Sequence, residues 1–157
     1  MKLDRLDKKI LMLMQKDARI SNLELAEQVG LSPSPCSRRI KALEESGLIQ
    51  KHVTLLNPEM LNLKLTAYIH INMDKHTPER LTNFNQAVAN MPEIMECALI
   101  TGNDADYQLK VVVPDMDYYQ RFLLEKLTRI EGVTGVRSSF VLNQVKQFTA
   151  LPLDHLD

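Results

Sequence analysis

Residues 21–50 read SNLELAEQVGLSPSPCSRRIKALEESGLIQ, and this stretch decides the fold of the first part of the chain. Ser21 followed by Glu24 is a capping-box pattern, which predicts a helix that begins just after Ser21. Gly30 is expected to end this helix, because glycine is favoured directly after a helix. Its predicted apolar side consists of Leu23, Ala26 and Val29.

The residues after Gly30 predict another helix with an abrupt start. Ser32 is placed to cap it, and Pro33 fits its first position, where a backbone N–H would have no partner within the helix. Gly47 is expected to end it. At about 100° per residue the helix has two different sides. Cys36, Ile40 and Leu43 form the apolar side, and Ser34, Ser37, Arg38, Lys41 and Glu45 form the polar side.

A further helix is predicted before this stretch, over residues 4–16, from the spacing of Leu6, Ile10, Leu13 and Met14. Short helices joined by a tight turn are typical of a helix-turn-helix, whose last helix enters the major groove of DNA. The helix that begins at Pro33 is then the reading helix, and its unpaired N-terminal N–H groups are expected to face a phosphate. Residues 50–56, QKHVTLL, predict a short strand that forms a wing.

The rest of the chain predicts a ferredoxin-like domain. Strand-like segments occur at 65–73, 96–102, 107–113 and 135–142, and helical segments at 78–90 and 116–130. The order strand, helix, strand, strand, helix, strand is the split βαβ arrangement. Residues 144–153 are expected to add an edge strand. The predicted fold is therefore α+β, with a winged helix-turn-helix domain at 1–57, a linker at 58–64 and a ferredoxin-like βαββαβ domain at 65–157.

Composition narrows the class of protein. The chain has 157 residues, 45% of them hydrophobic, which is enough for one ordinary domain or two small ones. No apolar run approaches the roughly 18 residues that span a bilayer, and the start is charged and unlike a signal peptide, so a cytoplasmic protein is predicted. Cys36 and Cys97 lie far apart without a histidine cluster, which predicts two buried thiols and neither a disulfide nor a zinc site.

Charge is distributed unevenly along the chain. Residues 1–57 carry ten Lys/Arg against seven Asp/Glu, whereas residues 58–157 carry nine against thirteen. The net charges of +3 and −4 suggest a basic module that meets a polyanion, joined to an acidic module with another task.

Several motifs, taken together, resemble the Lrp/AsnC (feast/famine) family of transcription regulators, and the leucine-responsive branch most. They are LDRLDKKIL, KDARIS, ELAEQVGLSPSPCSRRIKALEESGLI, LNPEML, TGNDADYQLKV, VPDMDYY and VKQ, in the family's order along nearly the whole chain. The resemblance implies a C-terminal amino-acid-sensing domain that dimerises through its sheets. It also implies homo-octamers of four dimers, with the effector bound at contacts between dimers. Leucine or methionine is the effector expected from this resemblance.

One loop departs from the pattern of the leucine-responsive branch. Relatives place two residues between a glycine and an Asp-Tyr pair, whereas three residues, 103–105, separate Gly102 from Asp106 and Tyr107 here. Because this loop helps to form the effector pocket in relatives, the extra residue bears on which amino acid is bound.

The predicted DNA contacts lie on and beside the reading helix. Arginine can bind guanine with two hydrogen bonds, serine can bind base or phosphate, and lysine mainly neutralises phosphate. The alternative is that these residues form an ordinary solvated helix face. The candidate residues are Ser32, Ser34, Ser37, Arg38, Arg39 and Lys41.

The predicted effector contacts combine a backbone anion site with a carboxylate. N–H groups near Gly102 suit the carboxylate of a free amino acid, and Asp104 or Asp106 suits its ammonium group. The alternatives are a plain hairpin turn at Asn103-Asp104, or a metal or acid–base site, for which no third ligand lies nearby in sequence. The candidate residues are Thr101, Gly102, Asn103, Asp104, Asp106, Tyr107, Ser138 and Ser139.

The sequence thus predicts a sequence-specific DNA-binding transcription regulator controlled by an amino acid, with no enzymatic activity, cofactor or metal. The predicted partners are double-stranded DNA, the amino acid and further copies of the chain. Two alternatives remain open: an enzyme similar to siroheme decarboxylases, and a nucleoid-type architectural protein with little sequence preference.

Overall fold

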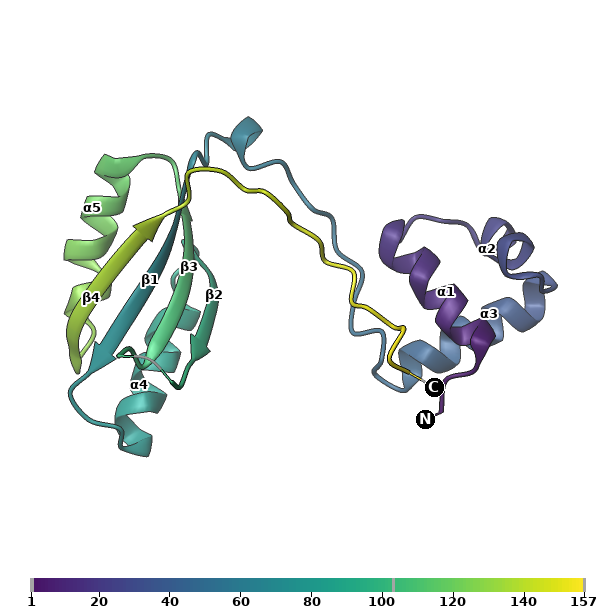
Figure 1. Cartoon of the computed structure of the whole chain (residues 1–157), viewed down its shortest axis with the longest axis horizontal. Coiled ribbons are helices and arrows are strands. Elements are labelled where there is room, and N and C mark those ends of the chain that lie inside the picture. The colour runs from purple at the N-terminus through teal and green to yellow at the C-terminus, as the bar shows by residue number, and fades with distance from the viewer. Residues whose placement is uncertain (1, 103, 157) are drawn as a thin grey trace. The chain divides into compact units, whose positions relative to one another are not determined.

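A computed structural model describes residues 2–102 and 104–156 of the chain (Figure 1). The chain divides into two compact units. Met1–Leu55 and Lys146–Asp157 form the first unit, and Leu56–Val145 forms the second. The C-terminal residues therefore do not belong to the ferredoxin-like domain, in which the sequence analysis placed everything from 65 to 157.

Three helices make up the folded part of the first unit. They are α1 (Arg5–Lys16), α2 (Asn22–Val29) and α3 (Pro33–Glu45). Asp4 and Ser21 each close a capping box, at α1 and α2 respectively, and so satisfy backbone N–H groups that would otherwise lack partners. Gly30 ends α2 with a φ of 81°, a left-handed conformation that favours glycine. These local signals confirm the predicted helix boundaries to within a residue or two.

The helices surround a small apolar core. The prediction that Leu23 belongs to this core is wrong, because Leu23 is exposed and Leu25 is buried instead. In an eight-residue helix a single apolar position is a poor guide to the buried side, because packing against α1 and α3 sets its rotation. The buried residues of this core are Ile10, Leu11, Leu25, Ala26, Val29, Cys36 and Leu43.

The second unit has the predicted order of elements. Its elements are η1 (Glu59–Leu61), β1 (Leu65–Met73), α4 (Pro78–Ala89), β2 (Ile94–Leu99), β3 (Tyr107–Val113), α5 (Met116–Glu125), η2 (Leu127–Arg129) and β4 (Val133–Phe140). The strands pair antiparallel in the spatial order β2-β3-β1-β4. The α+β fold class with a ferredoxin-like second domain is thereby confirmed.

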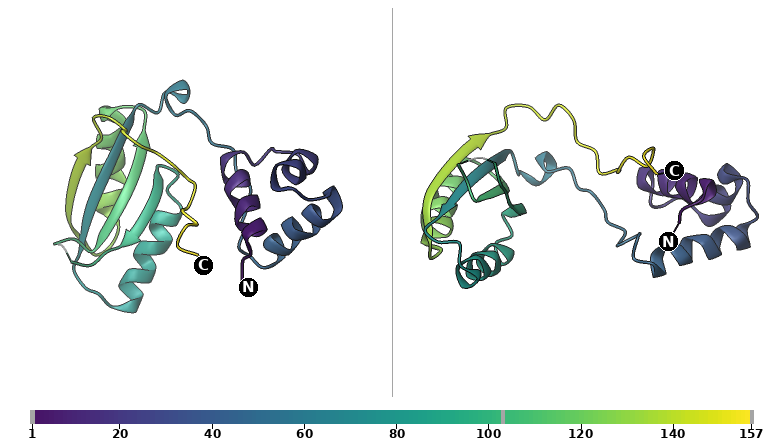
Figure 2. Two further views of the ribbon diagram at one scale, coloured as in Figure 1. Left: turned by 45° about the vertical axis from the view of Figure 1, so that its right-hand side comes forward. Right: turned by 60° about the horizontal axis from the view of Figure 1, so that its bottom comes forward.

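Helices α4 and α5 cover one face of this sheet (Figure 2). Alternate residues of β1, such as Ile69 and Ile71, point into the core beneath the helices. The intervening residues point to the face without helices, where Tyr68 lies opposite Lys110 on β3 and His70 lies opposite Arg137 on β4. One face is thus apolar and covered, and the other is polar and uncovered.

The two predicted outer strands, the wing at 50–56 and the edge strand at 144–153, do not form. An extended segment is stable as a strand only beside a hydrogen-bonding neighbour. The segment after β4 instead joins the first unit, where Leu153 packs against the helical core and the side chain of Gln15 makes hydrogen bonds to both backbone groups of Leu151.

Cys36 is buried as predicted, but Cys97 is exposed. Cys97 lies on β2, the edge strand of the sheet, whose residues after Ile94 are all exposed. An apolar pattern on an edge strand predicts burial only when a helix covers that edge.

Candidate DNA-binding and effector sites

The polar side of α3 is exposed, and its opposite side is fixed in the core. Cys36 and Leu43 are buried at 0% and 1% exposure, which sets the rotation of the helix about its axis. As a result four residues of the predicted DNA-binding set point away from the core. These exposed residues are Ser34, Ser37, Arg38 and Lys41.

Lys41 makes only a weak contact within the helix. Its Nζ lies 3.7 Å from Glu45 Oε1, and both side chains are well exposed. Exposed pairs of this kind contribute about 0–1 kcal/mol, so Lys41 remains available for a phosphate.

The first turn of α3 offers fewer backbone donors than expected. Pro33 and Pro35 have no N–H, and the Cys36 N–H donates to Ser32 O at 3.2 Å, so the N–H of Ser34 alone remains. Ser32 occupies the N-cap position, but its side chain makes no capping hydrogen bond. Since the proline at the first position already removes one donor and fixes φ, the helix begins without that bond.

Arg39 differs from the other predicted DNA contacts. Its Nη1 lies 2.7 Å from Asp4 Oδ2 and 2.7 Å from Asp7 Oδ1, at the start of α1. These two carboxylates raise the pKa of the Arg39 guanidinium. Both N–H groups of Nη1 are therefore bound within the protein, whereas the guanidinium of Arg38 makes no such contact to any described residue.

The predicted effector loop connects β2 and β3. Gly102 has a φ of 88°, and Thr101, Gly102 and Asp104 are exposed, whereas Asn103 lies outside the described residues. The loop is tied to the end of β1, because Asn72 Nδ2 donates a hydrogen bond to the carbonyl oxygen of Asp104. The Asp104 carboxylate has no hydrogen bond or ion pair to any described residue.

Both carboxylate oxygens of Asp106, in contrast, have partners within the protein. Its Oδ2 accepts the N–H of Met73 at 2.7 Å, and its Oδ1 lies 2.7 Å from Nε2 of His76. The Asp106 carboxylate therefore already has partners within the protein, unlike the carboxylate of Asp104. The sequence analysis gave His76 no role, since a partner thirty residues away leaves no pattern in the sequence.

Tyr107 directly follows this loop but its side chain is buried, and the two serines lie farther away. Tyr107 is 2% exposed, its ring stacks on Phe84 at 4.3 Å between centroids, and its hydroxyl lies 3.0 Å from Asn85 Oδ1. Ser138 pairs in register with Ile69 and Ser139 with Tyr68, away from the end of β1 where the loop lies. The predicted effector set is thus not gathered at one place within a single chain.

The side chains of Ser138 and Ser139 also point to opposite faces of the sheet, as neighbours on a strand must. Ser138 hydrogen-bonds to the hydroxyl of Tyr119 under α5. Ser139 is exposed on the face without helices.

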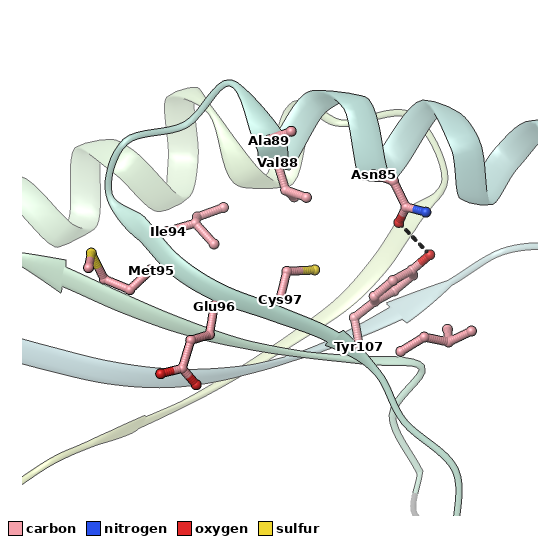
Figure 3. A pocket seen from close by; sticks show the side chains of 9 residues that line it. Asn85, Val88, Ala89, Ile94, Met95, Glu96, Cys97 and Tyr107 are labelled. Carbon is pink, nitrogen blue, oxygen red and sulfur yellow. Dashed lines mark hydrogen bonds between the residues drawn. The ribbon is translucent and has the colours of Figure 1, made fainter. Parts of the chain in front are cut away.

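A pocket of about 390 Å³ lies between α4 and β2 (Figure 3). Asn85 and Tyr107 meet at one end of it through their hydrogen bond, and Met95, Glu96 and Cys97 line it from β2. Although Cys97 is exposed overall, partial desolvation of its thiol beside the pocket raises the thiol pKa, so this cysteine is not activated as a nucleophile. No pattern in the sequence predicts this pocket, because the pocket depends on how α4 packs against the edge strand β2.

The described residues contain no group of three or more His, Cys, Asp or Glu side chains arranged to hold a metal ion. Within the same residues, no helix combines the length and the apolar character that crossing a membrane requires.

Comparisons with known proteins match both units. The winged helix-turn-helix DNA-binding family model covers residues 3–50, and the Lrp/AsnC ligand binding domain model covers residues 66–151. The leucine-responsive regulatory proteins of Klebsiella pneumoniae and Escherichia coli are each 46% identical over 149 residues, which is 95% of this chain and 90% of theirs.

Solved structures agree over the whole chain. A transcriptional regulator of Neisseria meningitidis in complex with L-Met superposes with a TM-score of 0.95 at 41% identity and covers 99% of both chains. An AsnC family regulator of Agrobacterium tumefaciens superposes with a TM-score of 0.93 at 42% identity and covers 98% of this chain and 99% of its own.

These relatives are transcription regulators and not enzymes, which removes the enzyme alternative. The exposed reading helix on a buried anchor, the four-stranded second unit and the matches to both family models lead to one assignment. The chain belongs to the Lrp/AsnC family of DNA-binding transcription regulators and carries that family's amino-acid-binding domain.

Proposed function

We propose that the protein is a sequence-specific regulator that reads DNA with the exposed side of α3. Ser34, Ser37 and Arg38 would meet base edges and phosphates in the major groove, and Lys41 would bind a phosphate. The observation that carries the proposal is the exposure of these side chains on a helix whose opposite side is buried. A transcription regulator of this kind would act in the cytoplasm, where bacterial and archaeal DNA is.

We further propose that the second unit binds leucine or methionine. The supporting observations are the leucine-responsive regulatory proteins among the relatives and the regulator solved with L-Met. Backbone N–H groups near Gly102 would bind the ligand carboxylate, and Asp104 would bind its ammonium group, because the carboxylate of Asp106 is already occupied. Thr101 would form part of the same loop surface.

The assembly that we propose is a homo-octamer of four dimers. Two copies would pair through the sheet faces that lack helices, where Tyr68, His70 and Arg137 are accessible. The exposed effector loop would then contact another dimer, so that the amino acid binds between dimers. Binding would shift the association equilibrium only if the ligand has different affinities for the two arrangements.

Fluorescence anisotropy tests the DNA-binding proposal. The full-length protein is titrated against DNA from upstream of its own gene and against a scrambled duplex, at two salt concentrations. Tighter, salt-sensitive binding to the native fragment is expected, with at least a tenfold loss in Arg38→Ala/Lys41→Ala. Equal affinity for both duplexes would instead indicate an architectural DNA-binding protein.

Isothermal titration with L-leucine and L-methionine tests the effector proposal, with D-leucine as the control ligand. Asp104→Ala is expected to weaken binding about tenfold or more without changing the melting temperature, since its carboxylate contacts no described residue. Asp106→Ala is the matched variant, and it should lower the melting temperature, because the Met73 N–H loses its acceptor. Unchanged affinity in Asp104→Ala would refute the assignment of this residue.

A further inference from the structure

Two adjacent arginines on α3 have different surroundings. Arg38 is exposed and makes no hydrogen bond or ion pair to any described residue. The side chain of Arg39 is 32% exposed and lies between Asp4 and Asp7 at the start of α1. Chemically identical side chains, one residue apart, are therefore available for different tasks.

The network around Arg39 uses every oxygen of the two carboxylates. Asp4 Oδ1 accepts the N–H of Asp7 at 2.8 Å, and Asp7 Oδ2 accepts the N–H of Asp4 at 3.1 Å. The two remaining oxygens both accept Arg39 Nη1 at 2.7 Å. The capping box of α1 and the reading helix are thus joined in one charge-assisted network.

A further contact fixes the N-terminal end of α3. Asn22 Nδ2, at the start of α2, donates to the carbonyl oxygen of Pro33 at 2.9 Å. The first residue of α3 is therefore bound to α2, and its second turn is bound to α1. Both contacts lie on the half of α3 that carries Ser34, Ser37 and Arg38.

We infer that Arg39 is a positioning residue that orients α3 for DNA reading and does not itself contact DNA. This inference rests on the proposed reading role of α3. A phosphate bound by Nη2 or Nε of Arg39 would lie beside the carboxylates of Asp4 and Asp7, which hold Nη1, and a phosphate that displaced them would leave two uncompensated carboxylates facing the DNA. Carboxylates repel phosphates, so either arrangement is unfavourable.

The test compares variants that remove either the cation or its partners. Arg39→Ala removes the guanidinium, whereas Asp4→Asn/Asp7→Asn keeps it and retains an acceptor oxygen for each capping bond. Arg38→Ala is the matched control, because it removes an arginine that contacts no described residue. DNA affinity is measured for the native and scrambled duplexes at several salt concentrations, at a temperature at which circular dichroism shows every variant to be folded.

A positioning role predicts the same result for Arg39→Ala and for Asp4→Asn/Asp7→Asn. Each should bind the native duplex about 5–20-fold more weakly, lose specificity over the scrambled duplex, and keep the wild-type salt slope. Arg38→Ala should instead reduce the salt slope by about one, as loss of a phosphate contact does. A loss of stability alone would leave the specificity of the folded protein unchanged.

Two outcomes would overturn the inference. One is wild-type or tighter DNA binding by Asp4→Asn/Asp7→Asn together with a reduced salt slope in Arg39→Ala, because Arg39 would then bind a phosphate. The other concerns the melting temperature of a variant that combines Arg39→Ala with Asp4→Asn/Asp7→Asn. If its decrease equals the sum of the decreases in the separate variants, the inference fails, because residues of a shared network should give a smaller combined decrease. If Arg38→Ala leaves binding unchanged, the proposed DNA face is wrong, and the melting temperatures still decide whether the network exists.

Discussion

Glu93 is the one charged residue that is buried among those that the structure describes, at 6% exposure. Burial raises the pKa of its carboxyl group, but the hydrogen bonds from Lys126, from its own backbone and from Tyr118, together with the positive charge of Lys126, lower it by more. The net pKa lies below the usual 4.5, so the residue is charged at neutral pH. Because the folded-state pKa is depressed, Glu93 stabilises the fold above about pH 4.5, and this contribution is lost as the pH falls through the folded-state value.

Lys126→Ala is expected to destabilise the protein by about 1–3 kcal/mol at neutral pH, because it leaves a buried carboxylate without its cationic partner. Burial then dominates, the pKa of Glu93 rises, and the loss of stability on acidification should begin at a higher pH. Urea unfolding between pH 4 and pH 8 measures both effects. Glu93→Gln should lower the stability by less than Lys126→Ala, because Lys126 is 45% exposed and can be hydrated. A steeper loss of stability with falling pH in Glu93→Gln than in the wild type would contradict this account.

At the scale of elements, the segment 146–156 belongs with the helical unit although it follows the sheet in sequence. The Gln15 side chain on α1 pairs with the backbone of Leu151 through two hydrogen bonds. Its Nε2 donates to Leu151 O at 3.1 Å, and its Oε1 accepts the Leu151 N–H at 2.6 Å. Leu153 adds an apolar contact to the helical core. The helical unit therefore consists of two segments of the chain, one before and one after the sheet unit.

Gln15→Ala should release this segment. The amide of Leu151 is expected to exchange with deuterium at least tenfold faster than in the wild type, because its acceptor is gone. Hydrogen exchange followed by mass spectrometry on peptides covering residues 146–156 measures the change. Gln15→Glu keeps an acceptor for the Leu151 N–H but loses the donor, and should be intermediate. Unchanged protection in Gln15→Ala would show that other contacts hold the segment.

At the scale of the whole molecule, the proposed dimer depends on the sheet face without helices. Tyr68 lies on this face, opposite Lys110 and Ser139, and contributes nothing to the buried core. In the proposed dimer a carboxylate in its place would be taken out of water at the contact between the two chains, which is unfavourable. The fold of each chain would be unaffected.

Tyr68→Asp is therefore expected to shift the protein toward monomers in sedimentation velocity. DNA affinity should fall at least tenfold with it, because linked helix-turn-helix units bind their second half-site at high effective concentration. Gln120→Asp, an exposed change on α5 on the other side of the sheet, is the control and should alter neither quantity. Wild-type assembly of Tyr68→Asp would exclude this face as the dimer contact.

Features that depend on neighbouring residues could be predicted from the amino-acid order alone. Capping boxes at Asp4 and Ser21, the proline at the start of α3 and the alternation along β1 are local patterns, and they fixed which elements form and in what order. The exposed side of α3 followed from the same periodicity. The motifs of the family, which span the chain, supplied the functional class.

Contacts between groups that are distant in sequence could be identified only in the folded chain. Arg39 pairs with carboxylates more than thirty residues away, and Asp106 with His76 at a similar separation. Leu151 meets Gln15 across 136 positions. In each case the residue type allowed several partners, and the choice depended on which elements approach one another in space. A polar side chain on a surface is therefore assigned to a ligand or to the protein only when its neighbours are known.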